Sequence, residues 1–228
     1  MLIRSKVPGS LLAKLSLHTS KYGLLHALAA HMGRRCPLFW RLAGPLVTAG
    51  YRKSYLRRAA PLILNLGGGN NGLQDCLTAD IDPHADVYAD MQRPLPFPDR
   101  CFDAVFLEEA IEHIPHCALQ DALSECLRVL KPGRIIRIVT PDLEYFASRV
   151  AADLTGGGEI NAFFYNHGHR RIYSKRAMQQ QCQRAGFVNV RFTACQDPNS
   201  RLAYLDTHAE RYGCNPQISL YLEVERPR

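Results

Sequence analysis

The sequence predicts an α/β fold: a mostly parallel sheet of seven strands, preceded by a helical N-terminal extension. Two observations carry this prediction. From Pro61 onward, short apolar runs alternate with helical patterns, and this alternation is the sequence form of a parallel α/β sheet. Before Pro61 the apolar residues instead recur at helical spacing, as Leu24, Leu28 and Met32 do within residues 10–33. We therefore divide the chain into an extension, 1–60, and an α/β domain, 61–228.

The extension is also distinguished by its charge. Residues 1–74 contain eleven Lys or Arg and no acidic residue, whereas the rest of the chain combines 17 basic residues with all 21 acidic ones. Pro37 and Pro45 are expected to interrupt its apolar stretch. The extension is interpreted as a solvated helical lid, or as a peripheral contact of residues 1–58 with an anionic membrane through the apolar residues 38–40. Nucleic-acid binding ranks last because no RNA-binding motif is found.

The cellular setting follows from what the sequence lacks. No run of 18 uncharged apolar residues and no signal peptide is found. The eight cysteines include no CxxC pair, which favours a reduced environment over a disulfide framework. We expect a cytoplasmic protein, with membrane association as the alternative.

Elements of the α/β domain are predicted in order along the chain. Helices are expected at 119–130, 143–154 and 175–185, the last with Ser174 as its N-cap and Gly186 as its end. Strands are expected at 62–66, 78–81, 86–88, 102–106, 135–139, 188–192 and 219–225.

The first of these strands runs directly into three glycines, 67–69, where a backbone without Cβ atoms can approach a ligand closely. This loop also matches the dinucleotide pattern Gly67-x-Gly69-x-x-Gly72, with Asp86 nineteen residues after Gly67. However, a pyrophosphate needs a helix after the glycines, and only residues 73–77 precede the next strand. An adenosine ligand without phosphates makes no such demand.

Two aspartates stand where such a ligand needs polar partners. Asp80 ends the second strand, where a carboxylate could hold ribose hydroxyls, and Asp90 follows the third, where an acceptor could bind the adenine amino group. Asp is also a common turn residue at such positions, so each aspartate alone is weak support. Their recurrence after successive strands favours an adenosyl site.

The order of motifs after the third strand resembles one known family. Residues 95–105 (LPFPDRCFDAV), 111–114 (IEHI) and 125–134 (ECLRVLKPGR) resemble the class I S-adenosylmethionine-dependent methyltransferases of the type 11 group. The following residues 141–144 (PDLE) are similar to a subgroup in which the helix after the glycine loop is very short. The resemblance spans about residues 61–192. It implies a Rossmann-like sheet whose last strand is antiparallel, and S-adenosyl-L-methionine as cofactor.

The resemblance also implies which residues bind the cofactor. The glycines 67–69 would lie against its methionine part, Asp80 would hold the ribose, and Glu108 would face cofactor and substrate. Asn65 replaces an acidic residue usual in the family, and so removes a countercharge to the cofactor ammonium. The full implied set is Asn65, Gly67, Gly68, Gly69, Asp80, Asp90, Met91 and Glu108.

Methyl transfer is an in-line displacement that needs alignment, and a base only where the acceptor is a hydroxyl or a protonated amine. Catalytic candidates are therefore sought after the fourth strand and in the polar loop 166–171. His113 is the first candidate base, although Glu112 and His113 could instead simply buttress the next helix. The predicted catalytic set is His113, Glu109 and His167. His167 and His169 could orient an acceptor, and together with Arg170 and Arg171 they could bind an anionic one.

A metal site built from His113, His116, His167 and His169 is conceivable, but the spacing is loose and we predict no metal. The predicted function is methyl transfer from S-adenosyl-L-methionine to a small or medium-sized acceptor, such as a sugar or a lipid-linked metabolite. Two alternatives stay open: a non-catalytic binding protein of the same fold, which Asn65 favours, and an NAD or nucleotide-sugar enzyme, which the missing helix disfavours.

Overall fold

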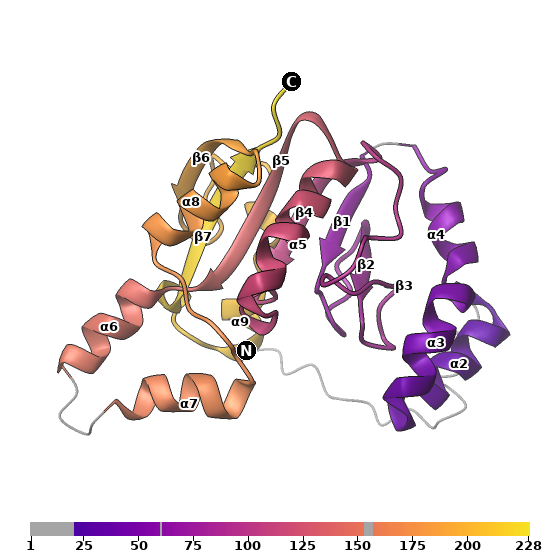
Figure 1. The fold of residues 1–228 in the computed structure, drawn as a ribbon, viewed down its shortest axis with the longest axis horizontal. Coiled ribbons are helices and arrows are strands. Elements are labelled where there is room, and N and C mark those ends of the chain that lie inside the picture. Colours follow the sequence, from indigo (N-terminus) through magenta and orange to yellow (C-terminus); the bar gives the residue numbers. More distant parts are fainter. Residues whose placement is uncertain (1–20, 60, 153–156) are drawn as a thin grey trace.

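The computed structural model describes residues 21–59, 61–152 and 157–228. At its centre is a seven-stranded sheet in the order β3-β2-β1-β4-β5-β7-β6 (Figure 1). The strands are β1 (Ile63–Leu66), β2 (Cys76–Asp80), β3 (Val87–Tyr88), β4 (Phe102–Glu108), β5 (Leu130–Pro141), β6 (Val188–Thr193) and β7 (Ser219–Glu225).

Strand directions agree with the sequence prediction. The pairs from β3 through β5 are parallel, and β7 is antiparallel to both β5 and β6. The strand β5 starts earlier than expected, because Leu130 already pairs with Phe102 of β4. The residues between Leu130 and Ile135 form an irregularity in which Gly133 has a φ of +67°. Arg134, which follows Gly133, is not among the residues with positive φ.

One face of the sheet is covered by helices α5 (His116–Val129) and α8 (Lys175–Arg184). Alternate residues of β1, Leu64 and Leu66, point into this core together with Leu123 and Met178 of the two helices. Ser174 caps α8 as predicted, since its hydroxyl accepts a hydrogen bond from Ala177 N. This layer forms the larger apolar core.

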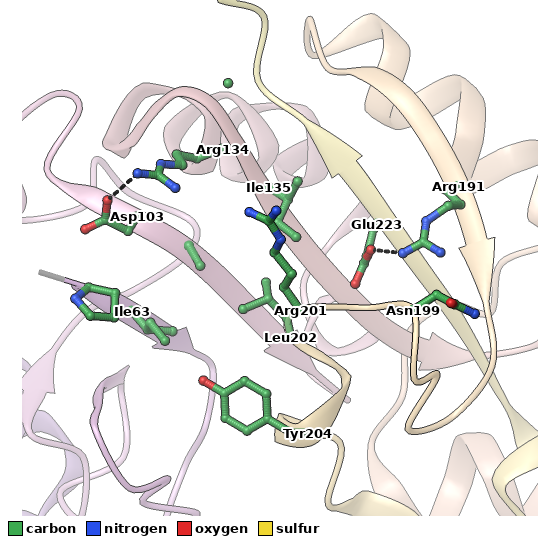
Figure 2. Close-up of a pocket in the computed structure, with 13 residues that line it drawn as sticks. Ile63, Asp103, Arg134, Ile135, Arg191, Asn199, Arg201, Leu202, Tyr204 and Glu223 are labelled. Atoms are coloured by element: carbon green, nitrogen blue, oxygen red, sulfur yellow. Dashed lines mark hydrogen bonds and ion pairs between the residues drawn. The ribbon is translucent and has the colours of Figure 1, made fainter.

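The opposite face has no long helix among the described residues. No helix lies between β1 and β2, and the connection between β6 and β7 covers this face through η2 (Ala203–Leu205), α9 (His208–Tyr212) and η3 (Pro216–Ile218). A pocket of about 480 Å³ remains here. Figure 2 shows the Arg201 side chain extending from the connection toward Ile135 of β5, and Tyr204 on the side of the pocket where Ile63 of β1 lies.

The extension forms three described helices, α2 (Leu24–Arg35), α3 (Pro37–Val47) and α4 (Ala49–Tyr55), which gather beside β3 (Figure 1). They cover the edge of the sheet, and Tyr55 joins the main core. The prediction that Pro45 interrupts the apolar stretch is wrong, because Pro45 lies inside α3. Pro37 does begin a helix. Residues 10–20 of the predicted helical stretch lie outside the described residues.

Helices α6 (Leu143–Ala152) and α7 (Gly158–His167) lie at the end of the molecule opposite the extension (Figure 1). The expected helix 143–154 is confirmed up to Ala152, and its last two residues lie outside the described part. The expectation that 166–171 forms a loop throughout needs correction, because α7 continues to His167. Gly168, with a φ of +69°, then ends that helix.

Candidate functional site

The glycine loop after β1 depends on two backbone conformations that favour glycine. Gly67 has a φ of +77° and Gly69 a φ of +52°. A Cβ at Gly67 would lie 2.5 Å from Cβ of Ala110 and 3.2 Å from Cε of Met91, whereas the position above Gly69 is open for 4 Å. Gly72 has neither a positive φ nor a close neighbour. The third glycine of the dinucleotide pattern is therefore not required by this backbone.

The side chain of Asn65 holds this loop by hydrogen bonds. Its side-chain amide donates to the Asn71 carbonyl at 3.0 Å and to Thr78 Oγ1 at 3.3 Å. A Cβ at Gly68 would lie only 2.3 Å from Asn65 Nδ2, so Gly68 makes room for the side chain. The amide that replaces the family's acidic residue thus has a structural role in holding the loop.

Asp80 links the end of β2 to the same loop. Its Oδ2 accepts a hydrogen bond from Gly69 N at 2.8 Å, and its Oδ1 accepts one from Asp82 N at 2.8 Å. Burial raises the pKa of Asp80 above its usual value, opposed by these backbone N–H groups. The predicted ribose carboxylate and the glycine loop are in direct contact.

Asp90 and Met91 lie on the far side of the loop. Asp90 is 8% exposed, and its Oδ1 accepts a hydrogen bond from Gln92 N at 2.9 Å. Met91 packs close to Gly67, as its Cε position shows. The residues predicted to line the adenine therefore lie next to those predicted to hold the methionine part.

Glu108, at the end of β4, is held by the β6–β7 connection. Its carboxylate accepts hydrogen bonds from Thr207 N at 2.7 Å and His208 N at 2.9 Å, and also from the Thr207 hydroxyl and Arg211 Nη2. Four donors from the β6–β7 connection thus occupy the side chain that was expected to face the cofactor. Asn71 Nδ2 donates to Thr207 Oγ1 at 3.1 Å, so the same connection also holds the glycine loop.

Two further carboxyl groups follow β4 and lie together. Glu109 has a left-handed backbone with a φ of +52°, a conformation that costs free energy in a non-glycine residue. Burial raises its pKa to about 7, opposed by the Ser219 hydroxyl, which donates to its Oε1 at 2.7 Å. Glu112 is completely buried, and burial together with Glu109 raises its pKa well above the usual range.

Imidazole rings gather beside these carboxyl groups. His113 lies 4.7 Å from His169 between ring centroids, and His167 stacks on His169 at 5.5 Å. Burial lowers the pKa of His113, and it lowers that of His169 to about 4. His116 lies apart on the first turn of α5 and is exposed. The three predicted catalytic residues, His113, Glu109 and His167, are therefore brought to one edge of the sheet, and their roles stay predictions.

The cluster adjoins the glycine-loop side of the site. Among the charges that act on His113 is Asp80, whose carboxylate raises the pKa of the imidazole and so opposes the effect of burial. A pocket of about 510 Å³ lies beyond Asp80, between Ile81 and Asp82 on one side and Trp40 of the extension on the other. The extension thus forms a wall near the carboxyl end of β2.

Sequence reasoning missed the residues of the β6–β7 connection. Thr207, His208 and Arg211 lie about a hundred positions from Glu108 and belong to no recognisable motif. The only signal for these residues in the sequence is that their side chains are polar. Their contribution depends on the tertiary path of the chain, which crosses the face of the sheet left open by the missing helix.

Comparison with known proteins agrees with this geometry. Residues 71–138 match the family model described as a methyltransferase domain. The chain is 39% identical over 83 residues to the sterol 24-C-methyltransferase ERG6B of Gibberella zeae, an alignment that covers 32% of this chain and 21% of that protein. The chain therefore matches about a fifth of the length of this curated relative.

Two solved structures show a similar fold. A chain of a Haloferax volcanii complex that contains the Trm112 methyltransferase activator superposes with a TM-score of 0.50 at 17% identity, over 88% of this chain and 97% of that one. Phosphoethanolamine N-methyltransferase 2 of Haemonchus contortus, solved with S-adenosyl-L-methionine, superposes with a TM-score of 0.50 at 13% identity, over 98% of this chain and 61% of that one.

The sheet order, the antiparallel last strand and the glycine loop define a Rossmann-like methyltransferase fold. The match over residues 71–138 adds that this part of the chain is similar to a methyltransferase domain.

Proposed function

We propose that this protein transfers the methyl group of S-adenosyl-L-methionine to a small or medium-sized acceptor, with a sugar or a lipid-linked metabolite as the acceptor class to test first. The observation that carries the proposal is the hydrogen bond from Gly69 N to Asp80 Oδ2, which joins the loop proposed to hold the methionine part to the carboxylate proposed to hold the ribose. The match of residues 71–138 to a methyltransferase domain supports the same chemistry.

The absence of a helix between β1 and β2 argues for this ligand over a dinucleotide. A pyrophosphate is bound by the N-terminus of a helix that directly follows the glycines, and the chain from Gly67 to β2 contains none. An NAD or nucleotide-sugar enzyme therefore lacks its main binding element here.

On the acceptor side, Glu109, His113 and His167 are the proposed catalytic residues. They lie at the carboxyl edge of the sheet, where ligands of open α/β folds bind, and His113 lies close enough to Asp80 to respond to its charge. A buried carboxyl group and a half-exposed imidazole next to the cofactor could receive the proton that a hydroxyl acceptor loses.

Isothermal titration of the full chain with S-adenosylmethionine and S-adenosylhomocysteine tests this function. We expect saturable binding of both and none of NAD. Binding of NAD without binding of either sulfur ligand would overturn the proposal in favour of the dinucleotide enzyme. If none of the three ligands binds, the proposal is overturned in favour of a non-catalytic binding protein of the same fold.

A specific observation favours membrane contact as a second candidate function of the extension. Leu38, Leu42 and Leu46 recur every four residues along α3 and are 66%, 71% and 78% exposed. Leu25 of α2 is a further exposed leucine of the extension, at 78%. The extension has no acidic residue, so an anionic lipid surface is the occupant that fits both the leucines and the charge.

The residues that form this surface differ from those predicted. Trp40 is 1% exposed and packs against Tyr88, so of residues 38–40 it is Leu38 that presents a large exposed surface. Among the described residues, no helix is long and apolar enough to cross a membrane. The contact proposed here is therefore peripheral.

Co-sedimentation with vesicles that contain phosphatidylserine tests this contact. We expect the intact chain to sediment and the double variant Leu42→Asp/Leu46→Asp to stay in the supernatant. Val188→Asp, which places the same charge on an exposed apolar residue of β6 outside the extension, is the control. Sedimentation that is equal for the intact chain and the double variant would remove the membrane hypothesis.

A further inference from the structure

Three buried polar atoms without a hydrogen-bond partner lie in the cluster beyond β4. They are Glu112 Oε1, His169 Nδ1 and the Tyr173 hydroxyl. A buried polar group without a partner costs free energy, so such atoms need an explanation. Glu112 and Tyr173 are near enough for the carboxyl group to raise the pKa of the phenol, although burial contributes more.

Ligand atoms of three side chains converge at this place. Glu112 Oε1 lies 3.8 Å from His113 Nε2. One ligand atom from each of Glu112, His113 and His169 lies within 4.8 Å of the other two. Zinc bonds to nitrogen and oxygen are about 2.0–2.2 Å, so ligand atoms on one ion lie about 3–4 Å apart. Small side-chain rotations would bring the three atoms onto one ion.

Backbone groups lie beside the two imidazoles. The backbone of Gly168 opposes the effect of burial on the pKa of His113, and the backbone of Phe163 does so for His169. A metal-binding imidazole characteristically uses one nitrogen for such a backbone group and presents the other to the ion. Arg170 N donates to the Glu112 carbonyl at 2.8 Å, which fixes the two segments relative to each other.

The charge of the cluster also favours a cation. Glu109 and Glu112 are adjacent, and Arg211, which is near Glu109, is bound to Glu108. A proton shared between Glu109 and Glu112 would reduce their repulsion, since the two side chains lie within hydrogen-bonding reach. That proton would leave Nδ1 of His169 without a partner, whereas a divalent ion would bind both Glu112 Oε1 and His169 Nδ1.

We propose that Glu112, His113 and His169 form a binding site for a divalent transition metal such as zinc, with an open coordination position toward the predicted acceptor side. Two imidazoles and one carboxylate are a ligand set that zinc and iron(II) use when a position is left for a substrate or water. This ligand set differs from the four histidines considered in the sequence analysis. Glu112 takes part, and the exposed His116 does not. That an ion would contact the acceptor rests on the proposed function, whereas the metal site itself does not.

Titration of the chelator-treated, tag-free chain with Co²⁺ tests the site, because the visible absorption of bound Co²⁺ reports its ligands. We expect one ion per chain, displaced by Zn²⁺. Glu112→Gln keeps the shape of the side chain and an acceptor for the Thr140 hydroxyl, and His169→Ala removes a nitrogen. Each should weaken Co²⁺ binding by at least about 100-fold, since even second-shell changes cost 10–100-fold. His116→Ala is the matched control and should bind as the parent does.

Circular dichroism shows whether each variant folds, and His113→Ala, whose ring is 43% exposed, provides a second ligand deletion with little effect on the core. Absence of saturable Co²⁺ and Zn²⁺ binding by the parent chain would overturn the proposal and favour the shared proton. Unchanged binding in folded Glu112→Gln and His169→Ala would also overturn it. Because the titration contains no S-adenosylmethionine, either result leaves the proposed function standing, and failure of cofactor binding leaves the metal result standing.

Discussion

The backbone N–H of Gly69 donates a hydrogen bond to Oδ2 of Asp80 at 2.8 Å, so the glycine loop and the end of β2 form one unit. The aspartate is only partly exposed and sits at the carboxyl edge of the sheet. A carboxylate in this position can hold the loop and still present lone pairs to ribose hydroxyls.

Asp80→Ala should therefore weaken binding of S-adenosylhomocysteine by roughly 10- to 100-fold, because hydrogen bonds to a charged group contribute about 1.5–3 kcal/mol. Isothermal titration gives the affinity, and Asp121→Ala, an exposed aspartate of α5, is the control. Equal affinity of the Asp80→Ala and Asp121→Ala variants would show that the ribose lies elsewhere.

Gly68→Ala should destabilise the folded chain, because the new Cβ would meet Asn65 Nδ2 at 2.3 Å and Thr78 Cγ2 at 2.9 Å. Overpacking of this kind costs about 1–3 kcal/mol. Gly72→Ala is the matched control, since it has open space and no positive φ, and it should change stability by less than about 1 kcal/mol. Urea unfolding measures both. The role given to Asn65 fails if the two variants are equally stable.

Much of this site could be predicted because its parts follow strands in regular order. Asp80 was placed from its position after a strand, and the absence of a helix after the glycines was predicted from the short segment before β2. Both inferences use local spacing, which a sequence displays directly.

The parts that escaped prediction depend on contacts between distant segments. Glu108 binds Thr207 and Arg211, about a hundred residues away, and no local pattern indicates such a pairing. The buried state of Trp40 depends in the same way on its packing against Tyr88 of β3. Where a side chain's partner comes from another layer, local spacing cannot reveal which way the side chain points.

Asp103 should make stability depend on pH in the acidic range. Although burial opposes the shift, the N–H of Leu62, the Lys131 ammonium and the charge of Arg134 lower the pKa of Asp103 below its usual value. A carboxyl group with a lowered folded-state pKa stabilises the fold above its unfolded-state pKa of about 4, and this contribution is lost as pH falls through the folded-state pKa.

Asp103→Asn should accordingly be less stable than the parent chain near neutral pH, and the difference in free energy of unfolding should shrink as the pH is lowered below about 4. Urea unfolding at a series of pH values measures this difference. A constant difference across the series would show that the ion pairs with Lys131 and Arg134 do not set the titration of Asp103.

Asp206→Ala tests the connection that replaces a helix on the second face of the sheet. Arg137 of β5 is completely buried, and its guanidinium donates to both carboxylate oxygens of Asp206, at 2.6 and 2.5 Å. Glu223 Oε1 also lies 3.2 Å from Arg137 Nη1, and Thr193 and Ala194 accept the remaining hydrogen bonds. Every donor direction of the buried cation is therefore directed to an acceptor.

Removing Asp206 would leave this guanidinium with a weaker set of partners in a place that water does not reach, which costs about 3–5 kcal/mol for a buried pair. Asp99→Ala removes a partner of Arg128 at the surface, where Asp99 is 71% exposed, and should cost at most about 1 kcal/mol. Urea unfolding compares the two variants. Because Asp206 directly precedes Thr207, the donor that holds Glu108, the larger loss should be accompanied by faster hydrogen exchange at residues 207–211. If the two variants lose equal stability, the buried pair is not what fixes the connection to the sheet.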